Sequence, residues 1–530
     1  MPPDDRLDLL LDAWKERAAT GTAAGVLNPD VEATLPAVWH GSDFVAQACL
    51  RDPSVLEGLV DSGDISACYA DGEYRRRLAS RLAGVDEETG LGAVLRRFRN
   101  REMIRIIWRD LSGWADLDEV LEDLSALADA CIDEALTRLY DWQTAGVSGT
   151  PRNGDGEPQR LVVLGMGKLG ARELNLSSDI DLIFAFAEQG ETDGRRPVPN
   201  EQFFTRLGQK LIKALNSQTV DGFVFRVDMR LRPFGESGPL VTSFDFMENY
   251  YQGQAREWER YAMIKARVVA GDLVAGEQLT EMLRPFVYRR YIDFGVVESL
   301  RGMKQLIEAS LHEKGMAANV KLGPGGIREI EFIGQAFQLI RGGRDPDLQI
   351  RPIQMVLQRL GARDLIPRRD VAELVAAYRF LRNTEHRIQA WRDEQTQLLP
   401  SDPEGRQRLA ATMGFADWDA FGGELDVHRE RVQRHFEELF AASDEDDGES
   451  NLSGIWLERP DVGVVEALVG AGFDDPHTVA GLLERYRDSR AVRGLGPRGR
   501  ERMDQLMPRV LASAGAVTSP LTVLGQILSL

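Results

Sequence analysis

The chain has 530 residues, of which 43% are hydrophobic and 28% charged, a composition ordinary for a globular protein of several domains. Its net charge of −20 argues against a nucleic-acid template as partner, because such binding needs a broad basic surface. The sequence contains no apolar run of 18 residues and begins with an acidic amphipathic segment, so it predicts neither a membrane span nor a secretion signal. We therefore expect a cytoplasmic protein.

The first two thirds of the chain divide into a helical and a mixed segment. Residues 1–145 show helical periodicity and predict a helical domain, which a polar loop at 146–159 closes. The segment 160–300 predicts a small mixed sheet with helices, an α+β core in place of a doubly wound one. Its expected elements are strand 161–165, a short helix at 168–175, strand 179–186, helix 200–216 and strand 222–231.

The remaining sequence is helical in pattern. Residues 301–440 predict a helical domain, in which an apolar stripe from Val371 to Trp391 faces the core and leaves Arg382, His386 and Arg387 elsewhere. For His386 we expect a surface or interface position. The run SDEDDGES at 443–450 predicts a solvated acidic linker, and 453–530 predicts a further helical segment. The whole is expected to be mostly α and multi-domain.

A pair of acids marks the central segment. Residues 161–186 read LVVLGMGKLGARELNLSSDIDLIFAF, and Asp179 and Asp181 lie two apart in the second strand. Alternate side chains share a face of a strand, so both carboxylates project together while Ile180 and Leu182 turn to the core. Two adjacent carboxylates repel, and a divalent cation allows both to stay ionised. Alternatively, an exposed edge strand with alternating acids would need no metal. The order of the surrounding elements helps to decide between these two interpretations.

That order is strand, glycine turn, short helix, and a strand with Asp-x-Asp. It is typical of the nucleotidyltransferase core, in which two metals bridge the acids and the nucleotide phosphates. A dinucleotide fold is the rival, because Gly165, Gly167 and Gly170 form G-x-G-x-x-G. Only eight residues separate Gly170 from Asp179, too few for a crossover helix. A Walker loop also fails, because Lys168 is not followed by Ser or Thr.

A third acid lies in the predicted strand 222–231. Alternation places Asp228, Arg230 and Arg232 on one face, where arginines beside an acid describe a phosphate site. The alternative is that these arginines pair with nearby glutamates at the surface. Further basic residues follow as far as Arg267 and carry the same two interpretations.

These residues carry a family resemblance. The string GMGKLGARELNLSSDIDLIF closely resembles the bifunctional glutamine synthetase adenylyltransferase/adenylyl-removing enzymes of bacteria, as do DGFVFRVDMRLRPFGESGPL and KLGPGGIREIEFIGQAFQLIRGG. The resemblance covers most of the chain. It implies a DNA polymerase beta-like core and two related halves, the first removing AMP from a tyrosine of glutamine synthetase and the second adding it. The string 173–181, ELNLSSDID, looks like the removing type. Because one Asp-x-Asp core is present and the chain ends in an apolar run, we expect the amino-terminal half.

The resemblance implies phosphorolysis, in which orthophosphate attacks adenylyl-tyrosine and releases ADP. Asp179, Asp181 and Asp228 are then the catalytic residues and the ligands of two Mg²⁺ ions. The expected nucleotide and phosphate contacts come from Gly165, Gly167, Ser177, Ser178, Arg230 and Arg232. Lys168 is a weaker candidate, with a solvated side chain as the alternative. The implied partners are adenylylated glutamine synthetase and a uridylylated PII-type nitrogen-regulatory protein. A non-catalytic scaffold and the ATP-dependent adding reaction remain open.

Overall fold

The computed structural model describes residues 3–19, 28–289, 300–305, 307, 316–444, 456, 464–517 and 519–529. The chain divides into two compact units, residues 1–436 and 437–530. Part of the predicted acidic linker and the start of the last predicted segment lie outside the described residues. Among the described helices, none is both long enough and apolar enough to cross a bilayer.

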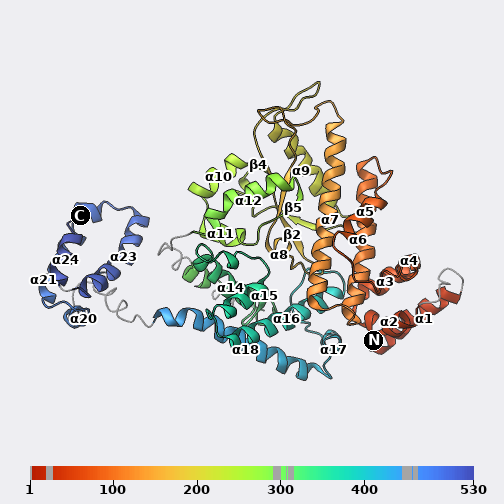
Figure 1. The fold of residues 1–530 in the computed structure, drawn as a ribbon. Helices are drawn as coiled ribbons and strands as arrows, with labels where there is room; N and C mark the ends of the chain where they lie inside the picture. The colour runs from red at the N-terminus through yellow and green to blue at the C-terminus, as the bar shows by residue number, and fades with distance from the viewer. Residues whose placement is uncertain are drawn as a thin grey trace. The chain divides into compact units, whose positions relative to one another are not determined.

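The first unit begins with a group of helices that ends in the long pair α6 and α7, which run side by side in Figure 1. Leucine, isoleucine and aromatic side chains pack both helices into the core, and the last part of α6 is buried on every side: each residue from Arg101 to Asp110 is buried, the charged ones included. The helices are α1 Pro3–Ala19, α2 Pro29–Gly41, α3 Asp43–Arg51, α4 Pro53–Asp61, α5 Glu73–Arg81, α6 Glu88–Leu111 and α7 Leu117–Thr144.

A five-stranded mixed sheet follows, which confirms the predicted α+β core. Its order is β3-β2-β1-β5, with β4 also paired to β2; β1 lies antiparallel to β2 and β5, whereas β3 and β4 lie parallel to β2. The strands are β1 Val162–Gly165, β2 Asp179–Phe186, β3 Arg226–Asp228, β4 Val241–Ser243 and β5 Arg267–Gly271. The helices within this segment are α8 Gly167–Gly170, α9 Asn200–Asn216, α10 Phe244–Gly253, α11 Glu257–Met263 and α12 Leu273–Val287, with a 3-10 turn at Gly235–Ser237.

Two predicted boundaries are wrong. The short helix ends at Gly170, since Arg172 takes a left-handed backbone with φ of 57°. The strand predicted at 222–231 covers only Arg226–Asp228. Its end has a local cause: the Asp228 carboxylate accepts the Arg230 backbone N–H at 2.8 Å, which starts a turn, and Pro233 lacks the N–H that a ladder needs.

Helices follow the sheet, as predicted for 301–440. They are α14 Ile327–Arg341, α15 Ile353–Ala362, α16 Arg368–Ala390, α17 Pro403–Thr412 and α18 Trp418–Asp444, with 3-10 turns at Met316–Ala318 and Pro346–Leu348. One hydrophobic core runs from Trp14 through β1 and β2 to Ala390. Residues 1–436, which hold nearly all of the parts predicted within the first 440 residues, form a single compact unit.

The second unit has its own core, built around Leu468, Phe473, Leu483 and Leu511. Its helices are α20 Val464–Gly470, α21 Pro476–Arg487, α22 Arg490–Arg493, α23 Pro497–Gly515 and α24 Pro520–Ile527. The Trp456 indole N–H donates to the Asp504 carboxylate at 2.8 Å and ties residue 456 to α23.

Candidate active site

Strand β2 separates its apolar and acidic side chains by face. Ile180 and Leu182 are completely buried in the core beneath α7 and α9, whereas Asp179 and Asp181 lie on the opposite face and are half-buried. The parallel pairing of β2 with β3 sets Asp181 directly beside Asp228, and Asp179 beside Arg226. Since neighbouring strands lie about 4.8 Å apart, the sheet brings together three carboxylates that are far apart in sequence.

The acids affect one another strongly. Burial, together with the charges of Asp179 and Asp228, raises the pKa of Asp181 to about 6, which Lys321 and Arg230 partly oppose. The pKa of Asp228 is lowered instead, because its carboxylate accepts hydrogen bonds from Arg230. Asp181 is therefore the carboxylate that a nearby cation would relieve most.

The glycine turn before β2 lets the backbone approach these acids. Gly167 has φ of 53°, and a Cβ added there would lie 3.1 Å from Asp181 Oδ2. A Cβ on Gly165 would meet the Val269 side chain at 2.6 Å. Gly165 is thus fixed by packing against β5, while Gly167 borders the carboxylates.

The three acids fit a divalent cation by their chemistry, since Mg²⁺ takes hard oxygen ligands and relieves repulsion between carboxylates. Within the described ranges, the three side chains with ligand atoms mutually within 4.8 Å are instead Asp370, Glu373 and His435. Arg434 and His435 pair with Glu373, so that group is an ion-pair network between α16 and α18.

Arg230 and Arg232 lie beyond the end of β3, so the prediction that they continue its face is wrong. Arg230 binds Asp228 through Nε at 2.8 Å and Nη2 at 2.5 Å, with its side chain 68% exposed. Arg230 therefore competes with a cation for the Asp228 carboxylate. Arg232 donates to the carbonyl oxygens of Met229, Glu236 and Gly238 and so closes the turn after β3.

The two predicted serines differ in their surroundings. Ser177 is buried, its hydroxyl donates to the Asp393 carbonyl at 2.9 Å, and Arg226 donates to the same hydroxyl at 3.0 Å. Ser178 is half-buried, and the structure records no hydrogen bond from its hydroxyl to any described residue. Of the two, Ser178 is the one whose hydroxyl remains available for a phosphate.

Helix α16 supplies a buried polar stripe, of which only Arg382 and His386 were expected to lie outside the apolar face. Arg382, Glu385, His386 and Gln389 are buried, and they lie behind the loop that leads into β2. Arg382 donates to the Glu173 carbonyl at 2.5 Å, and Gln389 accepts the Ser177 backbone N–H at 3.0 Å. The expectation of a surface or interface His386 is wrong. The signal in the sequence was the spacing of the four polar residues at i, i+3, i+4 and i+7, which places them on one face of the helix.

Lys168 also belongs to this buried group, so the solvated alternative is wrong. Its ammonium group lies 3.1 Å from Glu385 Oε1. Burial lowers the pKa of Lys168 to about 7, and the Glu385 carboxylate opposes that change. Lys265 bridges Glu173 at 3.3 Å and Glu331 at 2.6 Å, which joins α14 to the same loop.

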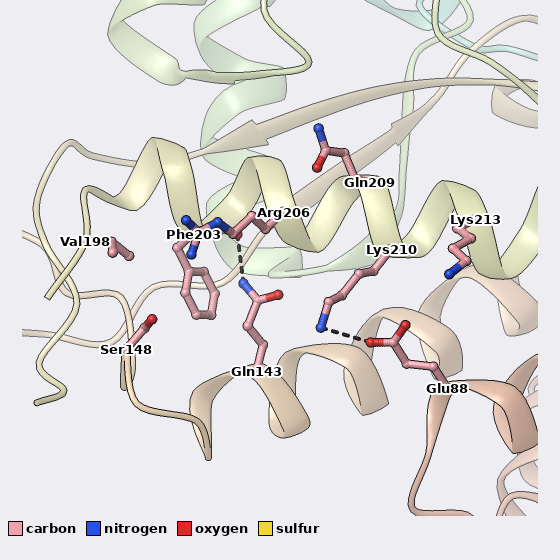
Figure 2. Close-up of a pocket in the computed structure, with 9 residues that line it drawn as sticks. All are labelled: Glu88, Gln143, Ser148, Val198, Phe203, Arg206, Gln209, Lys210 and Lys213. Atoms are coloured by element: carbon pink, nitrogen blue, oxygen red, sulfur yellow. Dashed lines mark hydrogen bonds and ion pairs between the residues drawn. The ribbon is translucent and has the colours of Figure 1, made fainter. Parts of the chain in front are cut away.

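A cavity of about 430 Å³ lies elsewhere, along α9 (Figure 2). Lys210 pairs there with Glu88 of α6 at 2.9 Å, and Gln143 of α7 donates to the Phe203 carbonyl at 2.8 Å. The basic side chains Arg206 and Lys213 also line it, but none of the three acids of β2 and β3 does.

Two family models match the chain. Residues 33–282, which contain the three acids, match glutamate-ammonia ligase adenylyltransferase, and residues 301–440 match GlnD PII-uridylyltransferase. Similar proteins, named bifunctional glutamine synthetase adenylyltransferase/adenylyl-removing enzyme, include those of Nitrosococcus oceani, Pseudomonas putida and Thioalkalivibrio sulfidiphilus. The Nitrosococcus oceani protein is 55% identical over 92% of this chain and 51% of its own length. The Pseudomonas putida protein is 52% identical over 92% of this chain and 51% of its own length. The Thioalkalivibrio sulfidiphilus protein is 47% identical over 100% of this chain and 56% of its own length.

The chain is a homologue of these bifunctional enzymes. It spans about half the length of the curated relatives that it matches. The resemblance drawn from the motifs is thereby confirmed, and the acids of β2 and β3 lie inside the segment that matches the first family model.

Proposed function

We propose that this chain removes AMP from adenylylated glutamine synthetase by phosphorolysis and thereby regulates nitrogen assimilation. The observation that carries the proposal is the string 173–181, ELNLSSDID, which resembles the removing type and whose Asp181 pairs with Asp228 across the sheet. In the reaction, an oxygen of orthophosphate attacks the phosphorus of adenylyl-tyrosine. The bond from phosphorus to the tyrosine oxygen breaks, that oxygen takes the proton from phosphate, and ADP leaves.

Asp179, Asp181 and Asp228 would hold two Mg²⁺ ions, which, when bound, neutralise charge developing at the phosphorus. Gly167 leaves space beside Asp181 for the phosphate, and Ser178 offers a hydroxyl to it. Arg230, once Asp228 is released, presents a planar pair of donors to a phosphate oxygen. Arg232 positions Arg230 by closing the turn.

Two partners follow from the same reasoning. Glutamine synthetase is the protein substrate that the relatives' name implies. The match of residues 301–440 to a PII-uridylyltransferase model supports a PII-type regulatory protein in its uridylylated state as the controlling partner.

The adding reaction is the second candidate, because the family model over 33–282 is described as an adenylyltransferase. It uses the same acids and metals and differs in taking ATP and unmodified glutamine synthetase. A non-catalytic scaffold is disfavoured by the presence of all three acids on adjacent strands.

Incubation of the chain with adenylylated glutamine synthetase and Mg²⁺, with and without orthophosphate, tests the proposal. We expect ADP, released only when phosphate is present, and an inactive Asp179→Asn control. ATP-dependent labelling of unmodified glutamine synthetase by this chain, without phosphate-dependent ADP release, would establish the adding reaction instead.

A further inference from the structure

Strand β3 places an arginine on the face of the sheet that carries the acids. Arg226 and Asp228 are two residues apart in β3, so alternation puts both side chains on one face. The register of β3 against β2 sets Arg226 beside Asp179 and Asp228 beside Asp181. Because neighbouring strands lie about 4.8 Å apart, this arginine is the cross-strand neighbour of the first of the three acids.

Neutral groups hold the Arg226 guanidinium in place. Its Nη1 and Nη2 atoms donate to the Ser177 hydroxyl at 3.3 and 3.0 Å, and Nη2 donates to the Asp393 carbonyl at 3.5 Å. Its Cζ atom lies 4.6 Å from the centre of the Phe223 ring. These contacts orient the side chain without neutralising its charge.

The nearby carboxylates pair with other arginines. The Asp393 carboxylate pairs with Arg99 at 2.7 Å, and Asp228 pairs with Arg230 at 2.5 Å. For Arg226 itself, the structure records no ion pair with any residue that it describes. A charged group that is half-buried, as Arg226 is, usually has a partner of opposite charge, because burial of an unpaired charge costs free energy.

Arg226 also keeps hydrogen-bond donors in reserve. A guanidinium carries five N–H groups in a planar fork, and the three recorded bonds of Arg226 reach one hydroxyl and one carbonyl oxygen. The fork matches two oxygens of a phosphate group. Its position beside Asp179 therefore suits an anion that lies next to the acids.

We propose that Arg226 binds a phosphate group beside the acids of β2 and β3. The proposal rests on the proposed phosphorolysis for the identity of that group, which is either the attacking orthophosphate or the phosphate of the adenylyl group. Arg226 differs from Arg230 in this role, because Arg230 competes for the Asp228 carboxylate whereas Arg226 has no carboxylate to leave among the described residues.

Binding of orthophosphate and of AMP in the presence of Mg²⁺ tests this without any turnover. The thermal midpoint of the full chain is measured against the concentration of each anion for the original protein, Arg226→Gln, Arg226→Lys and Arg408→Gln. Glutamine can still donate to the Ser177 hydroxyl but carries no charge, whereas lysine keeps the charge and loses the planar fork.

Arg408 is a matched control on α17. It is also half-buried over an aromatic ring, with its Cζ atom 3.6 Å from the centre of the Trp391 ring. Chloride at equal ionic strength controls for screening.

We expect at least one of the two anions to raise the midpoint of the original protein and of Arg408→Gln equally. For Arg226→Gln, the concentration that gives half the effect should rise about tenfold or more, with a smaller rise for Arg226→Lys. A weakened response to orthophosphate assigns Arg226 to the attacking phosphate, and a weakened response to AMP alone assigns it to the adenylyl phosphate.

The proposal would be overturned by curves for Arg226→Gln that match those of the original protein with both anions. It would also be overturned if the original protein responds to neither anion, or if Arg408→Gln weakens both responses as much as Arg226→Gln does. Failure of phosphorolysis is detected separately, by ADP release from adenylylated glutamine synthetase.

Discussion

Asp181 is largely buried beside two other carboxylates. Its pKa rises to about 6 through burial and through the charges of Asp179 and Asp228. A carboxyl with a raised native pKa stabilises the fold while protonated. That contribution is complete below about pH 4 and is lost as the pH rises through about 6.

Asp181→Asn should therefore stabilise the metal-free protein above pH 6, by on the order of 2 kcal/mol, with the difference vanishing near pH 4. Mg²⁺ should stabilise the original protein and not the variant. Urea unfolding at pH 4 and pH 8, with EDTA or Mg²⁺, measures both effects. Phosphate-dependent turnover should disappear in the variant, and near-normal turnover at ordinary Mg²⁺ would exclude Asp181 as a metal ligand.

The two arginines after β3 should respond differently to replacement by lysine. Arg232→Lys loses hydrogen bonds to three carbonyl oxygens, so it should lower the free energy of unfolding by about 1 kcal/mol. Arg230→Lys keeps a charge but loses the planar pair of donors, so it should raise the phosphate requirement several-fold with little change in stability. Phosphate titrations of ADP release, beside thermal unfolding, separate the two roles. If neither variant shifts the phosphate curve, Arg230 does not contact the anion.

At the scale of elements, α16 and β2 act as one structure. Gln389 accepts the Ser177 backbone N–H, and Arg382 donates to the Glu173 carbonyl, so the loop that enters β2 rests on this helix. The position of the Asp-x-Asp strand thus depends on a helix about 200 residues later in the chain.

Gln389→Ala should leave the buried Ser177 N–H without an acceptor and destabilise the protein by about 1–3 kcal/mol, with slower turnover from a loosened β2. Gln358→Ala, an exposed glutamine of α15, should change stability by less than about 0.5 kcal/mol. Thermal unfolding and turnover of both variants make the comparison. Equal effects would mean that the Gln389 contact does not support the loop.

At the scale of the whole molecule, the two compact units have separate hydrophobic cores. A fragment of residues 1–444, which keeps all of α18, should therefore fold alone and keep the far-ultraviolet circular dichroism of a helical protein with a cooperative thermal transition. It should also keep Mg²⁺-dependent stabilisation, since the three acids lie in the first unit. Loss of the cooperative transition in the fragment would show that the first unit needs residues 445–530.

Local pattern alone predicted much of this protein. Strand β2 and helix α9 begin and end where alternation and helical periodicity place them, because a strand repeats every two residues and a helix every 3.6. The pairing of Asp179 with Asp181 on one face follows from the same rule. The family was also predictable, because long ungapped motifs carry it.

Tertiary structure decided the rest. The sequence places Arg230 and Arg232 on a strand, but a side chain to backbone turn at Asp228 ends it. Periodicity also leaves Arg382 and His386 outside the predicted core, although both are buried, because it detects apolar stripes and does not identify which polar residues pack against another part of the chain. The neighbours of Asp181, namely Asp228 across the sheet and Lys321 from the turn before α14, follow from strand pairing and chain packing between distant residues, which local spacing does not encode.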